Sequence, residues 1–273
     1  MTSVVNADGP WLASAAAGRN PGGCGMIGGM GQLDGKGAIV TGGSRGIGRA
    51  IVTRLAADGA TVVFSYVKDE GAAREVADET GAFAVRADQG SLADLDRLFE
   101  QADVHLKTTG LHVVVGNAGD SIPREFGEVT EEDYDRHMAV NAKGPFFLIQ
   151  HAGRALSDGG RIIAISTVNT RIHPPGAALH TGGKGAVEHF IKVAALSFGR
   201  RGITANIISP GATDTDGLRA SNPGSTFKDT IGWTALGRLG RPEDIASAVA
   251  MLAGPDGAWI TGQNIAVDGG ILP

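Results

Sequence analysis

The sequence predicts an α/β fold, in which one doubly wound parallel sheet carries helices on both faces. Short apolar runs rich in β-branched residues alternate with longer amphipathic runs along the chain. Glycine is abundant, with 43 of 273 residues, which suits many tight turns between strands and helices. Such an alternation implies right-handed βαβ units and a parallel sheet that is buried on both faces.

The individual elements follow from this alternation. The expected strands are 37–41, 61–66, 83–87, 112–116, 161–166, 204–208 and 263–267. Between them, apolar residues recur at helical spacing. The expected helices are 47–58, 70–80, 92–107, 131–156, 179–200 and 242–252. The connection 209–240 interrupts the alternation of strands and helices. A connection of this length in a compact domain is usually a lid or a binding loop.

Composition and the N-terminal segment limit the class of protein. We expect residues 1–32 to be a poorly ordered Gly/Ala-rich tail before one domain, 33–273; an arm on a neighbouring subunit, anchored by Trp11 and Leu12, is the alternative. The net charge of −5 argues against nucleic acid as a partner. The single Cys24 excludes an internal disulfide and suits the reducing cytoplasm. We expect no metal site, no secretory signal and no membrane span.

A glycine-rich turn lies between the first expected strand and helix. Gly42, Gly46 and Gly48 have the spacing G-x-x-x-G-x-G. Such a turn lets the backbone approach a pyrophosphate closely, while the N-terminus of the helix faces the phosphates. Its place after a strand and before a helix predicts a dinucleotide site. The residues expected to bind the cofactor here are Gly42, Ser44, Arg45, Gly46, Ile47 and Gly48.

Further motifs follow in order along residues 33–270. They are Asp88, Asn117-Ala118-Gly119, Asn141, Ser166, Lys184, Pro210-Gly211, Arg241-Pro242-Glu243-Asp244-Ile245 and Val267-Asp268-Gly269-Gly270. With the glycine turn, this set resembles the short-chain dehydrogenase/reductase family, which has a Rossmann-type fold. The resemblance implies further contacts to the cofactor, with Asp88 next to adenine. The residues implied are Asp88, Asn117, Ala118, Gly119, Lys184, Pro210, Gly211, Thr213 and Thr215.

The end of the second strand predicts which nicotinamide cofactor binds. Members of the family that prefer NAD place an acid there to hold the ribose 2′-hydroxyl. Here the strand ends in Ser65-Tyr66-Val67, and no acid occurs before Asp69. Arg45 in the glycine turn and Lys68 after the strand supply cations that suit a 2′-phosphate. The predicted cofactor is therefore NADPH/NADP+.

The segment His180-Thr181-Gly182-Gly183-Lys184 differs from the family at the reacting centre. The family has Tyr-x-x-x-Lys on a helix, and this spacing puts both side chains on one face, one turn apart. The resemblance implies that Lys184 holds the nicotinamide ribose and that Ser166 bonds the substrate oxygen. It also implies that Asn141 supports a water connected to Lys184. The proton-donor position is occupied by His180.

Three interpretations of His180 remain open. It replaces Tyr as an adapted general acid, although neighbouring Lys184 disfavours the imidazolium. Alternatively, the site binds cofactor and ligand but turns over weakly, naturally or because a Tyr was exchanged to trap a complex. In the third interpretation the substrate brings its own proton.

The substrate expected from the resemblance is a small ketone. The segments 159–163 and 182–187 look like those of reductases of polyhydroxynaphthalenes and aromatic polyketide ketones. We expect Leu218, Phe227 and Trp233 to wall the substrate pocket. The alternatives are a 3-oxoacyl-carrier-protein reductase and a catalytically silent NADPH-binding regulator or scaffold. A homotetramer or homodimer is expected through the helices 131–156 and 179–200.

Overall fold

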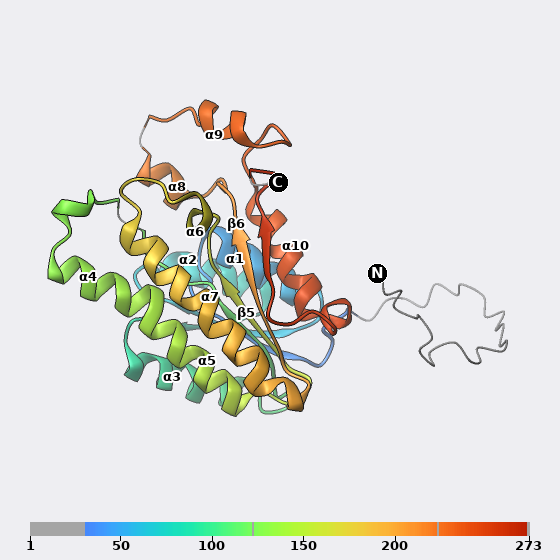
Figure 1. The fold of residues 1–273 in the computed structure, drawn as a ribbon. Coiled ribbons are helices and arrows are strands. Elements are labelled where there is room, and N and C mark those ends of the chain that lie inside the picture. Colours follow the sequence, from blue (N-terminus) through green and yellow to red (C-terminus); the bar gives the residue numbers. More distant parts are fainter. Residues whose placement is uncertain (1–30, 122, 223, 272–273) are drawn as a thin grey trace, which may run out of the picture.

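Seven apolar segments form one parallel sheet in the computed structural model, which describes residues 31–121, 123–222 and 224–271 (Figure 1). The strands are β1 (Gly37–Val40), β2 (Thr61–Tyr66), β3 (Phe83–Arg86), β4 (Leu111–Gly116), β5 (Arg161–Ile165), β6 (Thr204–Pro210) and β7 (Asn264–Val267). Their order is β3-β2-β1-β4-β5-β6-β7. In the centre, Ala38 pairs with Val62 on one side and with Val113 on the other. The predicted doubly wound fold is therefore confirmed.

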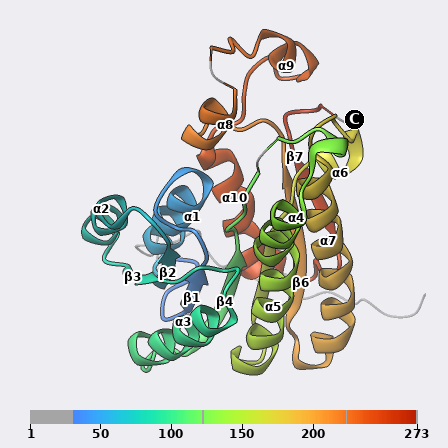
Figure 2. The same cartoon turned by 90° about the vertical axis from the view of Figure 1, so that its left-hand side faces the viewer.

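Helices cover both faces of this sheet (Figure 2). They are α1 (Gly46–Ala57), α2 (Glu70–Thr80), α3 (Leu92–His105), α4 (Glu131–Met138), α5 (Gly144–Ala155), α6 (Asn169–Ile172), α7 (Ala178–Phe198), α8 (Asp216–Ser221), α9 (Lys228–Trp233) and α10 (Pro242–Ala253). One buried cluster joins the sheet to α3, α5 and α7, and the other joins it to α1, α2 and α10. Burying apolar side chains on both faces explains why the strands read as continuous apolar runs.

The order of the strands reverses beside β1. From β1 the chain builds outward to β3, and then returns to place β4 on the other side of β1. The connections that leave β1 and β4 therefore part in opposite directions, which opens a crevice at the carboxyl ends of these strands. Ligands of open α/β sheets bind at such a point, and the glycine turn leaves β1 there.

The expected strands end within two residues of the observed ones, and so do five of the six expected helices. The exception is the single helix expected over 131–156. Residues Ala139–Lys143 form a π-helical turn that separates α4 from α5. The connection 209–240 contains the short helices α8 and α9, and α6 was also not expected. The 3₁₀ turns are Phe126–Glu128, Gly199–Arg201 and Pro255–Gly257.

The expected tail and its possible anchors, Trp11 and Leu12, lie outside the described residues, as does Cys24. In the described part of the chain, no helix is both long and apolar enough to cross a membrane. Within the same residues, no group of three or more His, Cys, Asp or Glu side chains is placed to hold a metal ion.

Candidate functional site

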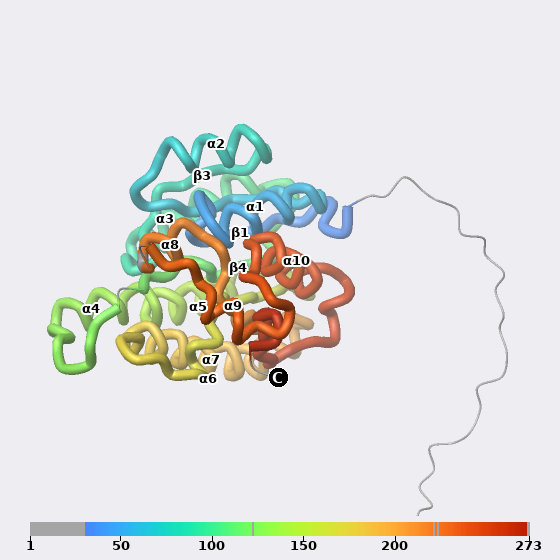
Figure 3. The backbone as a smooth tube through the Cα atoms, turned by 90° about the horizontal axis from the view of Figure 1, so that it is seen from above, coloured from blue at the N-terminus to red at the C-terminus, as the bar shows by residue number. Residues whose placement is uncertain are grey.

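A groove of about 410 Å³ lies at the carboxyl edge of the sheet. Figure 3 looks onto this edge, with α8 crossing near α1 and β4. Predicted cofactor residues that line the groove are Gly42, Ser44, Arg45, Gly46, Ile47, Gly48, Asp88, Asn117, Ala118, Gly119 and Thr215. Residues that the sequence did not single out for the site also line it; they include Ser65, Tyr66, Gln89, Asp120, Arg136, Val140 and Asp216. The groove therefore brings together the turn after β1 and the ends of β2, β3 and β4.

The glycine turn needs its glycines for two different reasons. Gly42 and Gly46 have φ values of 67° and 54°, a region that residues with a Cβ rarely adopt. At Gly48, a Cβ would collide with the carbonyl oxygen of Gly42. The turn therefore keeps its backbone open to the groove while α1 packs closely against it.

A buried hydroxyl holds the loops around the groove together. Oγ1 of Thr41, at the end of β1, accepts the N–H groups of Asn117 and Ala118 at 3.0 Å each. The same hydroxyl donates to Oε1 of Gln89 at 2.7 Å. Nε2 of Gln89 then donates to the carbonyls of Ala118 and Val140, both at 2.9 Å. Asn117 closes the network by donating from Nδ2 to the carbonyls of Thr41 and Gly42.

Two cations stand in the wall of the groove. Arg45 is exposed in the glycine turn, and Lys68 is exposed just beyond β2. Asp69 is the first acid after β2, but its Oδ1 accepts the N–H of Ala72 at 2.9 Å and caps α2. This part of the groove can therefore hold an anionic group such as a phosphate.

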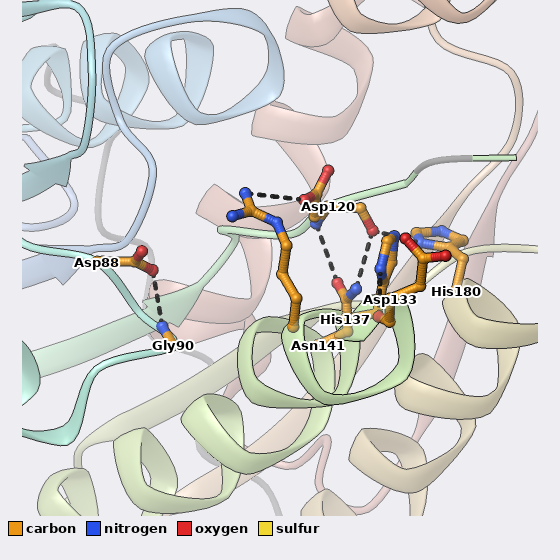
Figure 4. A network of polar contacts seen from close by, with 8 residues as sticks. Asp88, Gly90, Asp120, Asp133, His137, Asn141 and His180 are labelled. Carbon is orange, nitrogen blue, oxygen red and sulfur yellow. Dashed lines mark hydrogen bonds and ion pairs between the residues drawn. The ribbon is translucent and has the colours of Figure 1, made fainter. Parts of the chain in front are cut away.

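Asn141 is fully buried in the π-helical turn and clamps the main chain of Asp120 (Figure 4). Its Oδ1 accepts the N–H of Asp120 at 3.1 Å, and its Nδ2 donates to the carbonyl of Asp120 at 2.9 Å. The carboxylate of Asp120 pairs with Arg136, 3.4 Å away. Because π-helical turns often mark functional positions, the irregular turn and the buried amide together support a role at the site.

His180 bonds to the same carbonyl. Its Nδ1 lies 3.1 Å from the carbonyl oxygen of Asp120 (Figure 4). Burial, followed by the charges of Lys184 and of His137, lowers the pKa of His180 from 6.5 to about 4, against the opposing effect of the Asp120 carbonyl. His137 is itself fully buried in α4, with Nδ1 2.9 Å from the carbonyl oxygen of Asp133. The imidazole of His180 is therefore neutral at physiological pH.

Lys184 is buried one turn further along α7. Its Nζ donates to the carbonyl of Ile165 at 2.8 Å, and burial lowers its pKa from 10.5 to about 8. A Cβ on Gly119 would lie 3.1 Å from this Nζ and 3.2 Å from Oδ1 of Asn141. Lys184 and Asn141 thus converge beside Gly119, which lines the groove, although neither of the two lines the groove itself.

The Ser166 hydroxyl is engaged elsewhere. It donates to Oε1 of Glu188 in α7 at 2.6 Å, and the hydroxyl of Thr170 donates to the same oxygen at 2.8 Å. The next residue, Thr167, is half-buried at the carboxyl end of β5, and its Oγ1 accepts the N–H of Asn169. Thr167 is therefore a second hydroxyl that the sequence analysis did not consider for the substrate oxygen.

Other predicted site residues lie outside the groove. Gly211 lines a separate cavity of about 300 Å³ beside Asp268, and neither Pro210 nor the buried Thr213 lines the cofactor groove. None of Leu218, Phe227 and Trp233 lines the groove, and Trp233 is 67% exposed on α9.

The missed residues had a signal in the sequence. Thr41, Gln89 and Asp120 are polar residues that follow strands or strand-end motifs, where parallel sheets bind ligands. Arg136 and Val140 lie in α4 and in the π-helical turn. The expected uninterrupted helix over 131–156 gave no reason to single them out.

The sequence and the fold have counterparts among known proteins. A family model described as Enoyl-(Acyl carrier protein) reductase matches residues 42–272. The hydroxynaphthalene reductase-like protein Arp2 of Metarhizium brunneum (strain ARSEF 3297) is 41% identical over 257 residues, covering 88% of this chain and 96% of that protein.

Two solved structures are similar to this chain. A blue fluorescent protein from a metagenomic library, in complex with NADPH, is 42% identical with a TM-score of 0.84, covering 89% of this chain and 100% of that one. The angucycline C-6 ketoreductase LanV with bound NADP is 40% identical with a TM-score of 0.84, covering 89% and 97%.

The adjacent glycines before Lys184 provide a test of this packing. A Cβ on Gly183 would lie 2.7 Å from Cβ of Asn141, whereas a Cβ on Gly182 meets nothing within 4 Å. We expect Gly183→Ala to lower the free energy of unfolding by about 1–3 kcal/mol, because α7 must move away from the π-helical turn. Gly182→Ala should instead raise it by up to about 1 kcal/mol through helix propensity. Urea unfolding measures both, and equal effects would contradict the close contact.

Proposed function

The chain belongs to the short-chain dehydrogenase/reductase family, and from this premise we propose that it is an NADP-dependent reductase of a small aromatic or polycyclic ketone. The observation that carries the proposal is the continuity of the site. The glycine turn and two cations line one groove, and Gly119, which also lines it, lies beside Asn141 and Lys184. His180 joins this end through the carbonyl of Asp120.

The residues of the groove fit NADPH, which supplies the hydride when bound. The backbone of the glycine turn suits the pyrophosphate. Arg45 and Lys68 suit the 2′-phosphate, because the first acid after β2, Asp69, caps α2. Asp88 lines the groove and suits the adenine end, and residues 117–119 also line the groove. The NADPH and NADP complexes of the two similar structures support this assignment.

The chain's own groups hold the reacting centre as follows. Lys184 places a buried ammonium at the inner end of the groove, next to Asn141. Neutral His180 has the Nδ1–H engaged by the carbonyl of Asp120. With a pKa of about 4, only about one His180 in 10³ is protonated at pH 7. This favours an impaired or trapped site, or a substrate that brings its own proton, over an adapted general acid.

A free ketone is favoured over a carrier-bound acyl chain. Arg201 is held by Asp158 at 2.7 Å and by backbone carbonyls, and Arg161 donates to the carbonyls of Gly159 and Gly160. These cations are therefore engaged within the chain, while a docking surface for an acidic carrier protein needs cations that are free. The names of the similar fungal protein and of LanV point to flat, hydroxylated ring systems. We accordingly keep the 3-oxoacyl-carrier-protein reductase as the weaker alternative.

A catalytically silent NADPH-binding regulator or scaffold is the second candidate. The observation in its favour is the neutral His180 with its Nδ1 held by a carbonyl, in place of the family's Tyr. One of the similar structures is described only as a fluorescent protein in complex with NADPH. Binding of NADPH with no oxidation on any ketone tested would favour this candidate.

We also propose a homo-oligomer in the cytoplasm. On α5 and α7, Phe146, Val193 and Leu196 are 42%, 64% and 86% exposed. Such apolar side chains on neighbouring helices suit contact with a second copy of the chain. The cytoplasmic location rests on the single cysteine in 273 residues.

The assignment of the 2′-phosphate is tested by Arg45→Ala. We expect the dissociation constant of NADPH to rise about 10- to 100-fold, since a charge-assisted hydrogen bond is lost, while that of NADH stays unchanged. Calorimetric titration with both cofactors measures this. Arg49→Ala is the matched control, because Arg49 lies in the first turn of α1, next to the glycine turn, pairs with Glu79 and does not line the groove. A tighter complex with NADH in the unaltered protein would contradict the assignment.

The catalytic proposal is tested by His180→Tyr with hydroxylated tetralones and NADPH. We expect turnover to rise by roughly 10²-fold at pH 7, because a phenol is a protonated donor there and the neutral imidazole is not. The affinity for NADPH should stay the same, since His180 does not line the groove.

The pH profile separates the three interpretations. If His180 donates the proton, the rate in the unaltered protein rises as pH falls from 8 towards the pKa of about 4. A flat profile, together with no gain from Tyr, would assign the proton to the substrate or to water. A loss of turnover in His180→Tyr would establish His180 as an adapted catalyst.

The proposed assembly is tested by Leu196→Asp on α7. We expect the variant to have a smaller mass by sedimentation, because a buried and unpaired carboxylate opposes association. Val104→Asp on α3, where Val104 is 65% exposed, is the control and should keep the mass of the unaltered protein. A monomeric unaltered protein would refute the assembly.

A further inference from the structure

The geometry points to a site that recognises hydrogen-bond donors: we propose that Nε2 of His180 accepts a hydrogen bond from a hydroxyl of the ligand. The site would therefore select secondary alcohols and phenols over ligands that present only a carbonyl or an ether oxygen. This deepens the proposed function, on which it rests for the place where the ligand binds. It adds the chemistry by which the ligand is recognised.

The hydrogen bond to Asp120 determines the tautomer of His180. A carbonyl oxygen only accepts hydrogen bonds, so Nδ1 of His180 must carry the hydrogen that faces Asp120. A neutral imidazole has one N–H, and Nε2 then presents a lone pair. The tautomer thus follows from the partner and not from an assumed position of the proton.

The second step is that this partner is held in place. Asn141, which is fully buried, bonds both the N–H and the carbonyl of Asp120. The carboxylate of Asp120 is drawn towards Arg136. The carbonyl therefore cannot turn away to let His180 take the other tautomer without breaking the clamp.

The third step is the charge around the ring. Burial is the main effect that opposes a second proton on His180, and the charges of Lys184 on the same helix and of His137 on α4 add to it. The pKa of about 4 leaves Nε2 unprotonated over the range in which the protein would be assayed. Among the described residues, no hydrogen bond to Nε2 is formed, and the side chain is partly exposed. Nε2 is therefore available as an acceptor.

Residue 180 therefore offers the ligand a hydrogen-bond acceptor in place of the donor that the family's Tyr offers. A phenol at this position, as in the family pattern, can donate to a carbonyl oxygen of the substrate. Nε2 of His180 faces a carbonyl or an ether with one lone pair against another, and at least one of the two groups stays unpaired. Leaving a desolvated acceptor unpaired costs about 1–3 kcal/mol, which corresponds to about 5- to 150-fold in affinity.

The test measures binding to the NADPH complex with pairs of probes that differ in one hydrogen-bond donor. One pair is 2-naphthol and 2-methoxynaphthalene, and the other is 2-tetralol and 2-methoxytetralin. The dissociation constants are measured from the fluorescence of the bound NADPH. We expect each hydroxyl probe to bind at least about 5-fold more tightly than its methyl ether. The two pairs distinguish a phenol from an alcohol as the preferred donor.

Two variants control for the bulk of the methyl group. His180→Phe keeps a planar ring without nitrogens, and should bring the hydroxyl and ether probes to similar affinity. His189→Phe is the matched control, because His189 is an exposed histidine on the same helix, and it should keep the preference. If the preference survives in His180→Phe, or if neither hydroxyl probe binds the NADPH complex, the inference is overturned.

The tautomer is tested independently by ¹⁵N NMR of the histidine side chains, assigned with His180→Phe. Nε2 of His180 should have the shift of an unprotonated nitrogen, and this shift should move with 2-naphthol but not with 2-methoxynaphthalene. A protonated Nε2 in the protein, with or without NADPH, overturns the inference. Ketone turnover without a hydroxyl preference would retain the proposed function and reject this inference. The preference without turnover would support the inference and the silent candidate.

Discussion

The buried hydroxyl of Thr41 is the contact on which the geometry of the site depends. Thr41 directly follows β1, at the point where the strand order reverses. Its hydroxyl joins the turn after β4 to Gln89, which follows β3. Gln89 carries the connection to Val140 in the π-helical turn. The loops around the groove come from four distant parts of the sequence. Their polar groups are buried and must be satisfied, so the network fixes the loops relative to one another.

Asn141 connects this hydrogen-bond network to His180 and Lys184. The π-helical turn places it fully buried against the main chain of Asp120, and the carbonyl held in this way is also the partner of His180. The absence of a side chain at Gly183 lets α7 approach Asn141, which brings Lys184 to the same place. The position and the tautomer of His180 are therefore set by residues in the segment after β4, on the π-helical turn and on α7 together.

Much of this arrangement could be predicted from the sequence, because strand-ending motifs and helical spacing are local patterns. The alternation of strands and helices that predicts the doubly wound sheet, and the glycine spacing that predicts the turn, are both local patterns. The π-helical turn could not be predicted, since one extra residue in a helical turn leaves the apolar period nearly unchanged. The engagement of Ser166 by Glu188 depends on how β5 meets α7, which no local pattern contains. The short helices α8 and α9 could not be predicted for the same reason, because short helices in a long connection are placed by tertiary contacts.

With His in place of Tyr at position 180, the charge of Lys184 has the opposite effect on the release of a proton from that residue. A nearby cation favours whichever form of its neighbour carries the more negative charge. Beside a phenol, an ammonium stabilises the phenolate and so eases the release of the proton. Beside an imidazole, the same ammonium opposes the imidazolium and adds to the larger effect of burial, and together they lower the pKa of His180 to about 4. The ammonium that assists a Tyr donor therefore acts with burial against a His donor at the same position. What remains is a neutral ring, with Nδ1 engaged by the Asp120 carbonyl and a lone pair on Nε2.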